Sequence, residues 1–348
     1  MSCNSRPFKF LRALLLSILL LCLAQICAAQ LESAPPPLAD PADTRFKGAT
    51  EDFAIASLSA SHLISVPPMH ASFSRPNDSY TVDLLRVQWR WGDPIDLYLM
   101  KPKGVQNPPV ILALFGYPSD TDPFRDPAFQ EGVTREGFAA VGFLSALTGQ
   151  RYHDRPMKEW FLSELQESLA TSVHDVQMIL NYLAARGDLD MSRVGMFGQG
   201  SGATIAIVAS AVDSRIKALD VMDPWGDWPT WLAESRFPPE DERANFLKPE
   251  FLKKAAAFET LDWLPKIQAK RVRFQQNLFE SDTPVKVKEK LRAAVPAGTT
   301  VVVYKNAKEL NAAFPSNANI TGWLRQALQN PSASQVATGQ PEGSQPRP

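Results

Sequence analysis

The chain has 348 residues and an almost balanced charge, with 36 lysines and arginines against 37 aspartates and glutamates and a formal net charge of −1. This balance gives no reason to expect a nucleic-acid partner, and no basic run occurs in the body of the sequence. The patterned part, about 250 residues long, is sufficient for one large α/β domain with a full hydrophobic core.

The first 29 residues differ from everything that follows. Arg6, Lys9 and Arg12 precede an apolar run over residues 13–26, and small residues follow at positions 28 and 29. This arrangement is typical of a secretory signal peptide. The run is shorter than the roughly 20 residues that span a bilayer, so we expect export to the periplasm or the medium, with no stable membrane span after cleavage. An uncleaved membrane anchor is the alternative.

All three cysteines, Cys3, Cys22 and Cys27, lie within this signal segment. The mature chain is therefore expected to contain no thiol, which excludes a disulfide framework and a cysteine nucleophile. No histidine pair or histidine–carboxylate group has metal-ligand spacing either. We expect no metal and no other cofactor.

Two further segments flank the expected domain. Residues 30–77 begin with a stretch rich in proline and alanine, and we expect a linker and an N-terminal extension with a short helix and loops. Residues 330–348 contain almost no large apolar side chain, which predicts a disordered tail. The folded domain is expected over residues 78–329.

Strand and helix patterns alternate through this domain. Residues 80–90 and 95–101 flank a Trp-Gly-Asp-Pro turn and predict an antiparallel hairpin. Apolar runs and helical spacing then predict strands at 109–115, 138–143, 193–197, 216–222, 272–278 and 300–304, with helices at 127–136, 165–186, 202–212, 284–294 and 320–328. This alternation implies an α/β fold, with a mostly parallel central sheet and helices on both faces.

The segment 193–203, Arg-Val-Gly-Met-Phe-Gly-Gln-Gly-Ser-Gly-Ala, joins a predicted strand to a predicted helix. It resembles the nucleophile elbow of α/β-hydrolases, in particular of their dienelactone-hydrolase and prolyl-oligopeptidase-like branches. That elbow follows the pattern small-x-nucleophile-x-small, because the sharp turn crowds the backbone against the two small residues. Gly198 and Gly202 take the small positions, which leaves Gly200 where the resemblance implies a serine.

The resemblance covers about residues 80–329. It implies an α/β-hydrolase fold with a small cap after the sixth strand, at about residues 223–262. Glycine at position 200 also avoids about 1–3 kcal/mol of backbone strain that a side chain would introduce at such a turn.

A register shifted by one residue would make Ser201 the nucleophile. The small positions would then fall on Gln199 and Ala203, and glutamine does not meet the steric requirement of the turn. In the other interpretation, Ser201 belongs to the first helical turn, where its hydroxyl can satisfy a free backbone N–H.

The resemblance also implies where the rest of a catalytic triad would lie. The histidine of this fold follows the last strand, but residues 305–310 include none, and no histidine occurs after His174. Glu280 or Asp282 occupies the acid position after the seventh strand. The favoured alternative is that these are loop acids before the helix at Pro284, which Asp282 or Thr283 is well placed to cap.

A rewired site is the alternative to a lost one. His153 follows the fourth predicted strand, and in a parallel sheet its loop lies at the same edge as the elbow. Ser201, His153 and Asp223 can in principle converge there as nucleophile, base and acid. The competing interpretations are a loop histidine bonded to a nearby carboxylate for His153 and a turn residue for Asp223.

Aromatic residues are expected around the elbow. Gly116 and Tyr117 follow the third strand, where the resemblance implies an oxyanion loop, and Phe115 replaces a histidine that the family often has there. Three tryptophans follow the sixth strand, namely Trp225, Trp228 and Trp231. They can line a small-ligand pocket with Gly116 and Tyr117, or simply pack the cap against the sheet.

Two hypotheses of function remain open. In the first, the protein is a non-catalytic hydrolase-fold protein, a pseudoenzyme, that binds a small molecule or a protein partner. This hypothesis is favoured because the serine and the late histidine are both missing from their expected positions. In the second, the protein is an active serine hydrolase, an esterase or a peptidase-like enzyme, that uses Ser201, His153 and Asp223.

Overall fold

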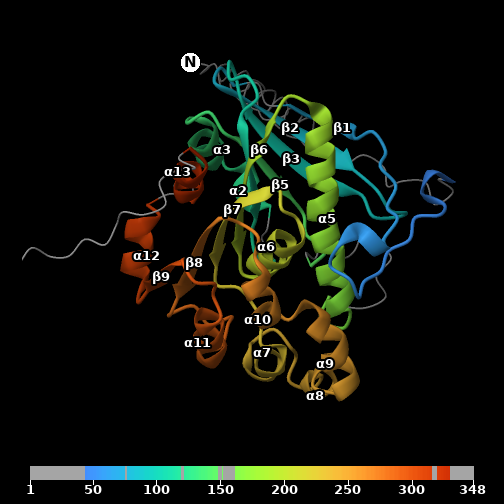
Figure 1. The fold of residues 1–348 in the computed structure, drawn as a ribbon, viewed down its shortest axis with the longest axis vertical. Coiled ribbons are helices and arrows are strands. Elements are labelled where there is room, and N and C mark those ends of the chain that lie inside the picture. Colours follow the sequence, from blue (N-terminus) through green and yellow to red (C-terminus); the bar gives the residue numbers. More distant parts are fainter. Residues whose placement is uncertain are drawn as a thin grey trace, which may run out of the picture.

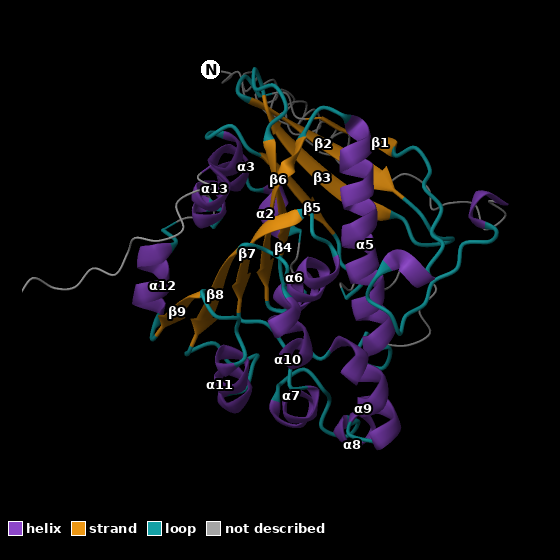
Figure 2. Cartoon of the chain, viewed as in Figure 1, coloured by secondary structure: helices purple, strands orange, loops and turns teal. Residues whose placement is uncertain are grey.

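The computed structural model describes residues 44–74, 77–118, 121–147, 151, 161–315 and 320–329. In this part of the chain, nine strands form one central sheet in the order β1-β2-β3-β5-β4-β6-β7-β8-β9. Helices cover the sheet on both faces, as Figures 1 and 2 show. The expected signal segment, the C-terminal tail and His153 lie outside the described residues.

The N-terminal side of the sheet is antiparallel. It contains β1 (Met69–Ser74), β2 (Tyr80–Val87) and β3 (Ile95–Pro102), and β3 pairs antiparallel with β5 (Ala139–Phe143). The expected hairpin is confirmed. The extension holds more regular structure than predicted, because β1 forms in a segment for which we expected a short helix and loops. It pairs with the backbone of β2, which would otherwise be left as the edge of the sheet.

The rest of the sheet is parallel, as predicted. It consists of β4 (Pro109–Leu114), β6 (Asp190–Gln199), β7 (Ile216–Met222), β8 (Arg271–Asn277) and β9 (Thr300–Tyr304), with β5 paired parallel to β4. The residues of β4 and β5 are all buried. Burial on both faces explains why these strands are continuous apolar runs rather than alternating ones.

Two hydrophobic cores lie on the two faces of the sheet. On one face pack α5 (Leu165–Arg186), α6 (Ser201–Val212) and α11 (Val285–Ala293). On the other face pack α2 (Asp122–Arg125), α3 (Pro127–Thr134) and α13 (Gly322–Gln329). A further helix, α12 (Ala307–Ala313), follows β9 and was not predicted. Within the described residues, no helix combines the length and apolar character needed to cross a membrane.

The segment between β7 and β8 consists of short helices. They are α7 (Trp228–Glu234), α8 (Arg243–Phe246), α9 (Pro249–Ala255) and α10 (Thr260–Trp263). Figure 1 shows these helices gathered at one end of the molecule, near α11. This segment corresponds to the cap expected at about residues 223–262, and Trp225 near its start lies beside Gly200, directly after β6.

A buried ion network ties the N-terminal extension to the sheet. Asp175 on α5 accepts hydrogen bonds from Arg90 at 2.7 Å and from Arg151 at 2.5 Å, and Arg151 also contacts Asp93 at 2.6 Å. Glu51 of the extension contacts Arg90 at 2.8 Å. Removing one member would leave a buried charge without its partner, so the network holds these segments together.

Candidate functional site

The turn between β6 and α6 has the geometry of a nucleophile elbow. Gly200 stands alone between the last strand residue, Gln199, and the first helical residue, Ser201, with φ +56° and ψ −123°. Its N–H donates to the carbonyl of Met222 on β7 at 2.9 Å. Side chains rarely adopt this backbone conformation, and hydrolases of this fold carry their nucleophile on such a strained turn.

The three glycines around this turn differ in how much space a Cβ atom would have. A Cβ on Gly198 would lie 2.6 Å from the carbonyl oxygen of Gly202, and a Cβ on Gly202 would lie 2.2 Å from that of Leu114. A Cβ on Gly200 would meet nothing closer than 3.6 Å. The backbone therefore requires glycine at positions 198 and 202, whereas position 200 has room for a side chain and lacks one.

Ser201 uses its hydroxyl to hold the neighbouring loop. The residue is fully buried, and its Oγ accepts a hydrogen bond from the Tyr117 N–H at 2.9 Å. In this fold, the oxyanion hole consists of the N–H after the nucleophile and an N–H from the loop after the strand equivalent to β4. By position these donors are Ser201 N–H and an N–H of the loop that contains Tyr117. The serine hydroxyl thus occupies a donor of that loop.

A cavity of about 260 Å³ opens beside the elbow. It is lined by Phe115, Gly116, Tyr117, Pro118, Pro123, Gln199, Gly200, Asp223, Trp225, Glu280 and Asp282. The cavity therefore brings together most of the residues that the sequence singled out. Ser201 and Trp228 are not in its lining.

The three tryptophans after β7 have different surroundings. Trp225 lines the cavity, and its Nε1 lies 3.8 Å from the point where a Cβ of residue 200 would stand. Trp228 is buried in the cap, where its Nε1 donates to the carbonyl of Phe258 at 3.0 Å. Trp231 packs between them, 4.7 Å from the ring of Trp225. Both expected interpretations apply, one to Trp225 and the other to Trp228 and Trp231.

Asp223 lies at the end of β7 with φ +49° and is 6 % exposed. Its Oδ1 accepts a hydrogen bond from the Asn277 N–H at 2.8 Å. Burial raises the pKa of Asp223 to about 7, although the Asn277 N–H and the charge of Lys288 lower it; Glu280 and Asp282 add to the rise. The side chain is therefore only partly ionised near neutral pH, a property that is common among the acids of functional sites.

The two acids after β8 are paired with cations. Lys288 on α11 is buried, and its Nζ lies 3.2 Å from Glu280 Oε2, while Arg236 forms an ion pair with Asp282. The helix-capping alternative for Asp282 is wrong, because α11 starts at Val285 with no side-chain cap. Sequence reasoning missed Lys288, whose one signal is its position on the apolar stripe of its helix.

The loop after β9, where this fold has its histidine, forms a local hydrogen-bonded turn. Asn306 accepts from the Glu309 N–H at 3.1 Å, and the Glu309 carboxylate accepts from the Lys305 N–H at 2.8 Å. This arrangement resembles a capping box at the start of α12. None of these three residues lines the cavity beside Gly200.

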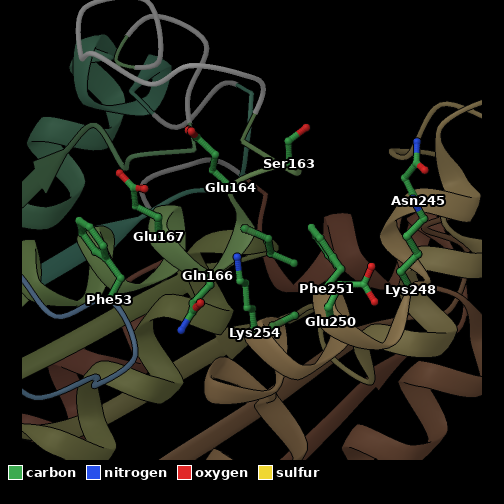
Figure 3. Close-up of a pocket in the computed structure, with 12 residues that line it drawn as sticks. Phe53, Ser163, Glu164, Gln166, Glu167, Asn245, Lys248, Glu250, Phe251 and Lys254 are labelled. Carbon is green, nitrogen blue, oxygen red and sulfur yellow. The ribbon is translucent and has the colours of Figure 1, made fainter.

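A second, larger hollow of about 410 Å³ lies elsewhere and shares no lining residue with the first. Figure 3 shows its wall, with Glu164, Gln166 and Glu167 from the start of α5 on one side and Lys248 and Phe251 from the cap on the other. Neither the elbow nor any predicted site residue contributes to it. Within the described residues, no cluster of histidine, aspartate and glutamate could hold a metal ion.

The strand order, the parallel sheet with its antiparallel start and the elbow after β6 together define the α/β-hydrolase fold, and this chain has that fold. The resemblance in the sequence is confirmed to this extent. No protein-family model matches the chain, and no curated protein matches it.

Solved structures that match the chain include esterases and other hydrolases. An acetyl xylan esterase from a Paenibacillus species is 18% identical, with a TM-score of 0.56 over 80% of this chain and 92% of its own. Acetyl xylan esterase 1 from a Thermoanaerobacterium species is 15% identical, with a TM-score of 0.52 over 73% of this chain and 87% of its own. A 2,6-dihydroxy-pseudo-oxynicotine hydrolase is 17% identical, with a TM-score of 0.51 over 75% of this chain and 68% of its own.

Proposed function

We propose that this protein is an exported, non-catalytic member of the α/β-hydrolase fold that binds a small ligand in the cavity beside Gly200. One observation carries the proposal. The position at φ +56° and ψ −123° has no side chain, and the hydroxyl of the adjacent residue, Ser201, is buried and accepts a hydrogen bond from the Tyr117 N–H.

The same hydrogen bond argues against Ser201 as a displaced nucleophile. To attack a substrate, the Oγ must reach the cavity and transfer its proton to a base. Ser201 is fully buried and absent from the cavity lining, and its Oγ would first have to release Tyr117. That release would also change the loop that supplies an oxyanion donor. The hydroxyl of Ser201 and an oxyanion would therefore depend on N–H donors of the same loop.

The cavity retains what a binding site needs. Small-ligand sites combine apolar and aromatic walls with a few polar groups that set the orientation of the ligand. Here Phe115, Tyr117 and Trp225 supply the walls, and Asp223 and Asp282 supply polar groups. A volume of about 260 Å³ is slightly below the range of roughly 300–1,000 Å³ common for drug-sized ligands, which suits a small metabolite.

Export is the second part of the proposal, and it is supported by the pattern of residues 1–29. Fractionation of the producing cell and mass spectrometry of the mature N-terminus test it. A chain that retains residues 1–29 in the membrane fraction would favour the anchor interpretation instead.

Labelling with a fluorophosphonate probe, combined with hydrolysis of p-nitrophenyl acetate, tests the loss of catalysis. An acetyl ester is chosen because two similar structures are acetyl xylan esterases. We expect neither labelling nor turnover from the native protein. Labelling that disappears in Ser201→Ala, but not in the exposed control Ser192→Ala, would overturn the proposal and support the site with Ser201, His153 and Asp223.

A further inference from the structure

The elbow end of the cavity offers hydrogen-bond donors without acceptors. Trp225 lines the cavity, with its Nε1 3.8 Å from the point where a Cβ of residue 200 would stand, and no hydrogen bond from this Nε1–H occurs among the residues that the structure describes. Unlike the Trp231 Nε1–H, which is buried without a partner, the Trp225 Nε1–H is therefore open to the cavity. The Ser201 N–H, in the first turn of α6, likewise has no acceptor in the described part of the chain. A ligand acceptor atom between the Gly200 turn and the indole could accept a hydrogen bond from Trp225 Nε1.

The indole of Trp225 is held in this orientation from several sides. Its backbone N–H donates to Thr204 Oγ1 at 2.9 Å, and its carbonyl accepts from Thr260 Oγ1 at 2.5 Å. Its ring packs against Trp231 and, at 4.9 Å, against Phe237. The donor is therefore pre-positioned, so that a ligand binds without the cost of ordering it.

The carboxylates that line the cavity can accept a cationic group of a ligand. Glu280 and Asp282 each have a cation, Lys288 and Arg236 respectively. Asp223 has no ion pair among the described residues, and only its Oδ1 accepts a hydrogen bond. Asp223 Oδ2 is thus left for a cationic group, and burial of this carboxylate strengthens such a contact.

The other residues that line the cavity also favour a cationic group over an anionic one. Among the described residues that line it, none is a lysine, arginine or histidine, whereas Tyr117 and Trp225 present aromatic rings. The acidic side chains in the lining are those of Asp223, Glu280 and Asp282. A ligand with an ammonium group therefore fits this wall better than a second anion does.

We infer that the cavity binds a small zwitterion, with an anionic oxygen on Trp225 Nε1 and an ammonium group against Asp223. This inference rests on the proposed function, because a ligand that stays bound at Gly200 must meet no nucleophile there. It goes beyond the proposed function because it specifies the charge at each end of the ligand.

Isothermal titration calorimetry with three matched probes tests the inference. Glycine betaine carries both charges, choline carries the cation alone, and pivalate carries the anion alone on a similar branched head. We expect betaine to bind most tightly, choline to bind at least about tenfold more weakly because it lacks the charged acceptor, and pivalate not to bind measurably.

Two substitutions test the two ends of the cavity one at a time. Trp225→Phe keeps a ring and removes the N–H, so it should weaken betaine binding about tenfold and change choline binding much less. Asp223→Asn should weaken both ligands. Trp263→Phe, the same change at an indole that bonds to the Ala257 carbonyl away from the cavity, should alter neither.

The pH dependence supplies a readout that a merely structural role would not produce. The groups that act on Asp223 are Glu280 and Asp282 after β8, Lys288 on α11 and Tyr304 on β9. Because the ammonium contact needs an ionised Asp223, betaine affinity should rise between about pH 6 and about pH 8. It should stay flat in Asp223→Asn.

Three results would overturn the inference: equal binding of pivalate and betaine, an unchanged betaine affinity in Trp225→Phe, or no binding of any probe. The ester assay separates this failure from that of the proposed function. Turnover of p-nitrophenyl acetate contradicts the non-catalytic protein itself, whereas absent turnover with no preference for the zwitterion contradicts only the ligand class.

Discussion

Replacement of Asp223 by asparagine should make the protein more stable, and increasingly so as the pH rises. Asparagine has the shape of aspartate, its amide oxygen can still accept from the Asn277 N–H, and it tolerates the positive φ of this position. What it removes is the charge that burial disfavours. The native protein tolerates this cost because, under the proposal above, the carboxylate serves the ligand.

The sign and size follow from the pKa. Burial raises the pKa of Asp223 from 3.8 to about 7. Between these values the folded state retains a proton that the unfolded state has lost, so the stability of the native protein falls as the pH rises through this window. At about 1.4 kcal/mol for each pH unit, the full loss is about 4 kcal/mol, an upper bound because the native site can relax around the charge.

Urea denaturation of both proteins near pH 4 and near pH 8 measures the effect. Other groups titrate in the same range, but they cancel in the difference between the two proteins. We expect a difference near zero at the lower pH and about 2–4 kcal/mol in favour of the variant at the higher pH. Asp122→Asn, at an exposed acid on α2, controls for the general loss of one negative charge.

Two results would refute this reasoning. A difference that does not change with pH would mean that Asp223 has no raised pKa. A variant that is less stable near pH 8 would mean that the ionised carboxylate has a stabilising partner, and the assignment of its free oxygen to a ligand would then fail.

Three other substitutions test the elbow and its support. Gly200→Ser should cost about 1–3 kcal/mol in urea denaturation because of the positive φ, and it should give no ester turnover; measurable turnover would reveal a base that already serves this position. Gly202→Ala should cost about 3 kcal/mol, since its Cβ would lie 2.2 Å from the Leu114 carbonyl oxygen; unchanged denaturation would contradict the crowding at the turn. Arg151→Met should cost about 3–5 kcal/mol, because Asp175 would lose one of its two buried cations; a thermal melt unchanged from the native protein would show that Arg90 alone suffices.

Most of the fold could be predicted because its elements follow local rules. Residues 165–186 repeat apolar side chains at helical spacing, and α5 spans Leu165–Arg186. The continuous apolar run at 109–115 corresponds to β4, which is buried on both faces. The strand β1 was missed because nothing in its own residues distinguishes it, and its pairing with β2 supplies the stabilisation.

The candidate site, like the fold, could be predicted only in part from the sequence. Gly198, Gly200 and Gly202 could be assigned from the sequence, since the requirement for small residues is a property of the turn itself. The capping interpretation of Asp282 was wrong because its choice of partner depends on Arg236, a residue of the distant cap. Lys288 went unnoticed for the same reason, because its burial against Glu280 is set by how α11 packs on the sheet.

Residue identity and spacing are sufficient to predict an α/β sheet that carries an elbow with glycine at its turn and a last loop without histidine. These features depend on backbone sterics and on residue identity, which are local. The hydrogen-bond partner of the Ser201 hydroxyl could not be predicted in this way, because Tyr117 lies on the loop after another strand. The raised pKa of Asp223 and the position of the Trp225 indole beside Gly200 likewise depend on tertiary packing, since they involve segments far apart in the chain.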